Sequence, residues 1–224
     1  MGLLGSLFGK KKEPASASIR DTLFADMPPE LWPPPGAAAD AFPWDAFAAA
    51  RAHLAAGRRD EAVAGWRRIV DHPGLEPRHY LQAWHFLRQQ GLQPPPATAK
   101  QVLGVVVEVG MPKGLDMLAA YPDHSARYYN FSGAGVVWEH PDTSLDAAID
   151  ALLAEAAHVV AQIGPWDKER PGPPQTGSVR LSFLTPSGLH FGQGGLDVIS
   201  RDPKGGRLLQ LATELMQAMI GKTK

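Results

Sequence analysis

Histidines, one serine turn and several glycine clusters are the features of this sequence whose residue types and spacing could support chemistry. The chain has eight histidines and no cysteine, which excludes thiolate metal sites, iron–sulfur clusters and thiol catalysis. No H-E-x-x-H pair occurs, and Glu139, His140 and Asp142 are neighbours in one turn, too close together to surround an ion. Ser187 stands in TPSGL rather than in a G-x-S-x-G elbow. The sequence therefore predicts no metal site and no catalytic residue, and an unrecognised enzyme is kept only as a second alternative.

The glycine clusters suggest an anion site rather than a nucleotide fold. The peptide FGQGG at 191–195 is not G-x-G-x-x-G, so no dinucleotide cofactor is expected. Lys204, Gly205 and Gly206 precede a helical pattern whose first N–H groups could bind an anion with the help of the lysine. These three residues are the predicted anion-binding site, and an ordinary glycine-rich helix start is the alternative.

A set of polar side chains on short alternating segments predicts a recognition surface. Apolar and polar residues alternate near 103–109, 115–121, 128–131, 136–139, 179–183 and 189–191, and short turns separate most of these segments, as in an antiparallel sheet. If the odd-numbered residues face the core, the opposite face carries Tyr128, Asn130, Glu139, Arg180, Ser182 and His190. Tyrosine, arginine and histidine are typical of binding surfaces. We expect a partner- or ligand-binding face here, with a solvated or covered face as the alternative.

Two long helical patterns must support this sheet. Apolar residues recur at helical spacing over 144–163 and again over 206–220. The predicted fold class is α+β: an N-terminal helical segment, followed by an antiparallel five- or six-stranded sheet packed with two long helices. In topology alone, this order is similar to that of small adaptor modules with a profilin-like layout.

The chain divides by composition into four parts. Residues 1–13 are an amphipathic basic segment, 14–45 a proline-rich linker or strap, 46–96 a helical segment and 97–224 the α+β domain. In the strap, Trp32 and Trp44 favour packing on the chain's own domain over a free linker, because a disordered segment would leave two large apolar rings exposed.

Within the helical segment, the spacing of five residues carries a resemblance. Ala50, Gly57, Ala62, Trp66 and Pro73 stand near the positions of the small, turn, aromatic and terminal residues of a helical repeat. Residues 46–74 therefore resemble a single tetratricopeptide-type helical hairpin. The resemblance implies a protein-binding helical surface, and three simply packed helices are the alternative.

The first residues of the chain predict contact with a membrane surface. Apolar residues at helical spacing are followed directly by a basic cluster, which suits an anionic lipid interface. The predicted membrane-contact residues are Leu3, Leu4, Leu7, Phe8, Lys10, Lys11 and Lys12. The start also fits the myristoylation pattern M-G-x-x-x-[ST], and a segment docked on the body of the protein is the alternative.

Composition limits the remaining function classes. A hydrophobic fraction of 44% and a charged fraction of 20% are typical of a globular protein. The net charge of −1 argues against a nucleic-acid partner. We expect a non-enzymatic cytoplasmic interaction protein, an adaptor or scaffold with a protein partner, with a peripheral place at the inner face of the membrane. The alternative is a regulatory module that senses a small ligand or an anion.

Overall fold

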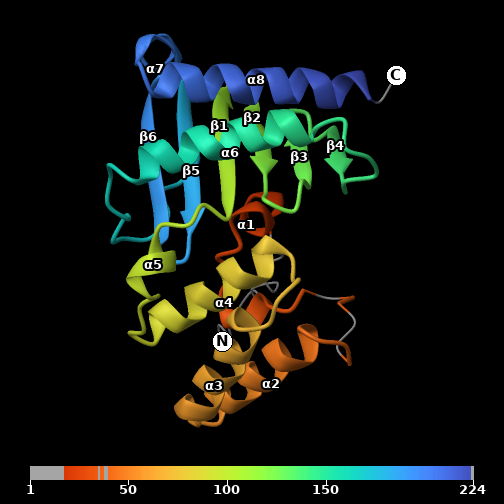
Figure 1. Ribbon diagram of the computed structural model, residues 1–224, viewed down its shortest axis with the longest axis vertical. Coiled ribbons are helices and arrows are strands. Elements are labelled where there is room, and N and C mark those ends of the chain that lie inside the picture. The colour runs from red at the N-terminus through yellow and green to blue at the C-terminus, as the bar shows by residue number, and fades with distance from the viewer. Residues whose placement is uncertain (1–17, 35, 38–39, 223–224) are drawn as a thin grey trace, which may run out of the picture.

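The computed structural model describes residues 18–34, 36–37 and 40–222 (Figure 1). Its elements in chain order are α1 (Ile19–Phe24), the 3-10 turn η1 (Pro29–Leu31), α2 (Trp44–Ala55), α3 (Arg59–Val70), α4 (Pro77–Gln89), α5 (Pro96–Ala99), β1 (Gly104–Met111), β2 (Gly114–Ala120), β3 (Ala126–Tyr129), β4 (Gly135–Trp138), α6 (Asp146–Val160), β5 (Ser178–Thr185), β6 (Gly188–Gly195), α7 (Leu196–Arg201) and α8 (Gly205–Gly221). The predicted α+β fold is confirmed. The short helices α1, α5 and α7 were not predicted.

One antiparallel sheet organises the domain. Its six strands lie in the order β4-β3-β2-β1-β5-β6, so the first four form a meander and the hairpin β5–β6 is added beside β1. The long helices α6 and α8 both cross the same face of this sheet (Figure 1). We call this the first face. Its core joins the alternating residues Val105, Val107, Leu181 and Phe183 to the apolar stripes of the two helices.

The opposite face of the sheet, here called the second face, is covered as well. Helix α1 places Leu23 and Phe24 against it, and Leu81 comes from α4. The Tyr121 hydroxyl donates a 2.7 Å hydrogen bond to the Leu23 carbonyl. The connection between α6 and β5, residues 165–177, also reaches this face, since the Pro171 carbonyl accepts hydrogen bonds from Arg20 of α1 and from Arg180 of β5. The sheet is therefore the middle layer of the domain, and neither face is a bare surface.

The N-terminal helices form a second core at one end of the sheet (Figure 1). The strap packs onto them: Met27 and Trp32 are buried, and the Trp32 ring lies 5.3 Å from that of Trp44. The side-chain amide of Gln82 holds the strap by exchanging two hydrogen bonds with the backbone of Met27, 3.1 and 2.8 Å long. The tryptophans thus pack on the domain as predicted.

The structure tells whether a helix could cross a membrane, but it does not test the predicted contact of the first residues with a membrane surface. None of the helices in the described ranges is long and apolar enough to cross a bilayer. The predicted membrane-contact segment, residues 1–13, lies outside the described residues.

Candidate functional site

The sheet surface predicted to carry recognition does not exist as an open surface. Strand pairing places Tyr128 opposite Leu118 and Val136, on the first face beneath the helices. Arg180 pairs with Glu108 on the second face and is 2% exposed. The prediction of which residues face the helices was right for β5 but wrong for β3. The side chains of Arg180 and Tyr128 therefore lie on opposite faces of the sheet.

The remaining members of the predicted surface are also separated. His190 pairs with Phe183, which puts it on the first face, fully buried. Asn130 lies in the turn after β3, where its side-chain oxygen accepts from the backbone N–H groups of Ser132 and Ala134. Glu139 follows β4 and forms an ion pair with a neighbouring arginine. The five predicted residues therefore form no common site.

Arg180 is instead part of a buried charge network on the second face. Its Nη1 group lies 3.3 Å from Glu108 Oε2, and Arg20 Nε of α1 lies 2.5 Å from Glu108 Oε1. Both guanidinium groups also donate to the Pro171 carbonyl. Burial lowers the pKa of Arg180, and the Glu108 carboxylate opposes that shift. This network joins the sheet to α1 and to connection 165–177, so its role is structural.

The predicted anion site at Lys204 is closed by the chain itself. Asp202 Oδ1 accepts from the N–H groups of Lys204 and Gly205, at 3.0 and 2.7 Å. The Asp202 carbonyl accepts from Gly206 at 2.8 Å. These hydrogen bonds lower the pKa of Asp202, so a carboxylate of this protein already occupies the place that an external anion would take. The prediction is corrected accordingly.

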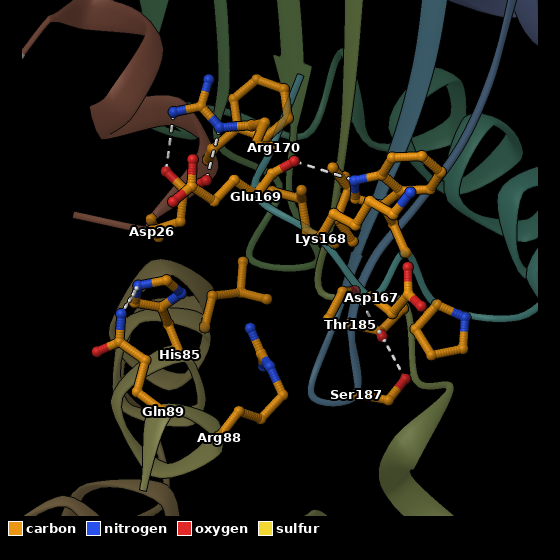
Figure 2. Close-up of a pocket in the computed structure, with 18 of the residues that line it drawn as sticks. Asp26, His85, Arg88, Gln89, Asp167, Lys168, Glu169, Arg170, Thr185 and Ser187 are labelled. Carbon is orange, nitrogen blue, oxygen red and sulfur yellow. Dashed lines mark hydrogen bonds and ion pairs between the residues drawn. The ribbon is translucent and has the colours of Figure 1, made fainter. Parts of the chain in front are cut away.

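A cleft of about 490 Å³ on the described part of the chain has room for a small ligand. It lies where α4 faces the β5–β6 turn and the start of connection 165–177, with the end of α1 closing one side (Figure 2). Apolar side chains from all of these elements line it: Phe24, Leu81, Pro165, Trp166, Leu184 and Leu189. The size is in the ordinary range for small-molecule sites.

Arg88 supplies the dominant charge on the α4 wall. Its Nη1 group donates a 2.6 Å hydrogen bond to the Pro186 carbonyl at the β5–β6 turn. Within the described ranges, no carboxylate lies within 4.0 Å of this guanidinium. Burial lowers its pKa to about 10, and only Asp26 acts against that shift. Arg88 is partly buried, and a guanidinium that is partly removed from water without a counter-ion favours the binding of an anion.

Asp26 is not free to neutralise Arg88. Both of its carboxylate oxygens accept from Arg170, at 2.6 and 3.0 Å, and Arg170 also pairs with Asp21 at 2.6 Å. The Arg170 guanidinium stacks 4.3 Å above the Phe24 ring. Figure 2 shows this cluster across the cleft from Arg88. The cluster sets one guanidinium against two carboxylates, and both oxygens of Asp26 are occupied by Arg170, so Arg88 keeps no direct carboxylate partner.

His85 lies one turn before Arg88 on the same helix. Its Nε2 atom is 3.0 Å from the Gln89 side-chain amide nitrogen, which as a donor requires His85 Nε2 to be the acceptor. Burial and then the charge of Arg88 lower the pKa of His85 to about 4. The imidazole is therefore neutral near pH 7, and its Nδ1–H is a donor on this wall.

At the facing wall, Ser187 lines the cleft and contacts His190, which is buried behind it in the sheet. The distance from Ser187 Oγ to His190 Nε2 is 3.2 Å, and Thr185 Oγ1 lies 2.9 Å from Ser187 Oγ. No carboxylate orients the imidazole: in the described chain, His190 Nδ1 has no hydrogen bond of normal geometry. Burial lowers the pKa of His190 to about 4. A base this weak, without a third group, does not activate a serine, so the hydroxyls serve as hydrogen-bonding groups.

Trp166 provides an aromatic surface at the third wall. Its indole Nε1 donates to the Glu169 carbonyl at 3.0 Å, and its ring lies 5.2 Å from that of Phe191. The ammonium group of Lys168 lies 5.5 Å from the Trp166 ring, in cation–π range. Because 38% of this tryptophan stays exposed, it is positioned to cover the apolar part of a bound molecule.

Sequence reasoning overlooked this cleft. Its signal was present as His85, Arg88 and Gln89, which stand at i, i+3 and i+4 and therefore share one face of a helix. A second signal was the S-x-x-H spacing of Ser187 and His190 across a tight turn. No family model, curated protein or solved structure matches this chain. The cleft geometry therefore carries the functional conclusion.

Proposed function

We propose that this protein binds a small anionic ligand in the cleft and that Arg88 holds the anionic group. The observation that carries the proposal is the Arg88 guanidinium, which faces a cleft of about 490 Å³ with one backbone hydrogen bond and no carboxylate partner in the described chain. This function corresponds to the alternative in which the protein senses a small ligand or an anion, with Arg88 in place of Lys204 as the anion-binding residue.

The walls of the cleft favour a monocarboxylate with an apolar body. One unpaired guanidinium matches a single negative charge, and its planar fork suits a carboxylate. Leu81, Leu184 and Leu189 line the cleft together with Trp166 and would contact an aliphatic or aromatic portion. The hydroxyls of the β5–β6 turn and the His85 Nδ1–H supply directional hydrogen bonds. A dianionic phosphate would need a second cation beside Arg88, and the lysine of the cleft, Lys168, has its ammonium group at the Trp166 ring instead.

A thermal-shift panel with paired compounds tests this function. Aromatic and aliphatic carboxylates are compared with their own primary amides and with phosphate monoesters of similar size. Carboxylates should raise the melting temperature, and their amides should not. A panel in which amides stabilise the protein equally would show that the anionic group is irrelevant.

An Arg88→Met variant supplies the matching control in the protein. It keeps the apolar stem of the side chain, so the cleft should bind the best carboxylate about 10- to 100-fold more weakly, as expected from losing a charge-assisted hydrogen bond. Arg67→Met, an exposed site on α3, should bind like the wild type. The Arg88→Met protein should be as stable as the wild type or more so, because it no longer buries an unpaired charge.

A protein partner is a second candidate function, supported at another surface. Strand β4 is an edge of the sheet, and Val137 in this strand and Phe131 in the turn before it are 52% and 46% exposed. Exposed apolar side chains beside an unpaired strand edge are typical of a docking surface. If a partner binds here, Val137→Lys should abolish its capture from a lysate while leaving the melting temperature unchanged.

A further inference from the structure

Two histidines and two aspartates from separate parts of the chain meet near the start of α6. His124 belongs to the turn between β2 and β3, and His140 follows β4. Asp146 is the first residue of α6, and Asp150 lies one turn later on the same helix. The sequence analysis considered His140 only with its neighbours in one turn and predicted no metal. Chain folding adds His124, about fifteen residues away, and the helix adds two carboxylates.

The side-chain atoms of this cluster have the spacing of a metal site. His140 Nε2 lies 3.0 Å from Asp146 Oδ1, and His124 Nδ1 lies 3.8 Å from Asp146 Oδ2. One ligand atom from each of these three residues lies within 4.8 Å of the others. Around a tetrahedral zinc ion with bonds near 2.1 Å, ligand atoms stand about 3.4 Å apart. Small side-chain rotations therefore suffice to bring all three onto one ion.

Asp150 gives His124 the orientation that a metal ligand needs. Its Oδ1 atom lies 3.0 Å from His124 Nε2. A hydrogen bond from Nε2–H to this carboxylate places the proton on Nε2 and leaves the Nδ1 lone pair directed toward Asp146. Carboxylates hold metal-binding histidines in this way in many zinc sites.

Asp146 is the residue that both histidines approach. Its Oδ1 atom is removed from water, and its close polar contact in the described part of the chain is His140 Nε2, 3.0 Å away but without the geometry of a hydrogen bond. A carboxylate oxygen that is removed from water and not hydrogen-bonded is unusual. A cation between Asp146 and the two imidazoles would satisfy it.

The backbone holds both histidines in an uncommon conformation. His124 has a φ of +61° and His140 a φ of +53°, a left-handed region that non-glycine residues seldom adopt. Their rings lie close together, with centroids 5.1 Å apart and planes inclined by 41°. Strained positions that converge on one point are a feature of functional sites.

We propose that His124, His140 and Asp146 bind one divalent transition-metal ion of the zinc class, with Asp150 as the positioning residue for His124. Imidazole ligands favour zinc and its neighbours over calcium and magnesium, which prefer oxygen. Three protein ligands leave one position of a tetrahedron open. The histidine side chains are 27% and 36% exposed, so an ion can enter from solvent and the open position can hold water.

Zinc alone, added to the full chain freed of metal by a chelator and carrying no histidine tag, tests the proposal. Isothermal titration should show about one equivalent bound, and cobalt(II) substituted for zinc should give the intense visible absorption of a tetrahedral site. Asparagine tolerates left-handed backbone, so His124→Asn and His140→Asn remove the ligands and keep the turns. Each of these, and Asp146→Asn, should bind zinc at least tenfold more weakly, and Asp150→Asn about 10- to 100-fold more weakly.

His158→Ala is the matched control. His158 is an exposed histidine beside a glutamate on the same helix, and its removal should leave zinc affinity unchanged. Melting temperatures of the metal-free variants, expected to equal that of the wild type, separate lost ligands from lost folding. Zinc affinity that is unchanged in the His124→Asn, His140→Asn double variant, or a wild type that binds no zinc, would overturn the proposal.

Discussion

Glu108 is the carboxylate that makes the buried charges of Arg20 and Arg180 on the second face tolerable. Its side chain is fully buried and accepts three hydrogen bonds, two from Arg20 and one from Arg180. A Glu108→Gln substitution keeps the shape and removes the charge, leaving two adjacent guanidinium groups with no counter-ion. Breaking a buried ion pair in this way costs about 3–5 kcal/mol, a large share of the roughly 5–15 kcal/mol that holds a domain folded.

Urea unfolding followed by circular dichroism measures this loss directly. For a chain of this size, 3–5 kcal/mol corresponds to a fall in melting temperature of roughly 6–20 °C, at about 2–4 °C per kcal/mol. The control is Asp60→Asn, which breaks the Arg59–Asp60 ion pair, whose side chains are 53% and 95% exposed, and should cost less than about 1 kcal/mol.

A second substitution tests the cause of the loss. Adding Arg20→Met to Glu108→Gln removes one of the two unpaired cations, so part of the lost stability should return. The two changes are therefore expected to be strongly non-additive. A Glu108→Gln protein within about 1 kcal/mol of the wild type, or strict additivity in the double variant, would refute the view that this network is held by charge balance.

Three further predictions concern the effect of buried residues elsewhere in the protein on its stability. The pKa values of His85 and His190 are lowered to about 4, so the folded chain binds fewer protons than the unfolded chain between about pH 4 and 6.5. The free energy of unfolding is therefore highest above about pH 6.5 and falls as the pH drops toward 4. Replacing both histidines with glutamine should flatten this pH dependence, measured by urea unfolding. Gly110→Ala places a Cβ against a backbone oxygen of the connection beside it and should cost about 1–3 kcal/mol in the same assay. A 98–224 fragment lacks the buried side chains Leu23, Phe24 and Leu81 that cover the second face and should be roughly 5 kcal/mol less stable than 18–224; equal unfolding midpoints would show that this cover contributes nothing.

The fold class was predictable because the first face of the sheet has a strong apolar pattern. Val179, Leu181 and Phe183 alternate with polar residues, and the stripe of α6 fits a single helical period. The phase of β3 was not predictable in the same way. Tyr128 and Tyr129 are adjacent and chemically alike, so alternation could not say which one faces the helices.

The covered second face explains the other sequence-level error. An alternating pattern shows only that one face of a strand is more polar than the other. The arginine at position 180 was therefore interpreted as a residue exposed to solvent. Its partner Glu108 lies directly opposite on β1, 72 residues earlier in the chain, and such a pairing is visible only once the strands are in register. The cleft and the histidine cluster were missed for the same reason, because each assembles from segments far apart in the sequence.

The ion pairs that join connection 165–177 to α1 and to the residues just after it also set an order of events during synthesis. Arg170 pairs with Asp21 and Asp26 across 149 and 144 residues. At about 5–20 residues per second, α1 leaves the ribosome roughly 7–30 s before Arg170 does. During that interval Leu23 and Phe24 have no finished sheet to cover, so a short apolar helix stays available to chaperones or to other nascent chains. The second face can be completed only after Arg170 has left the ribosome, and the first face later still, once α8 has followed.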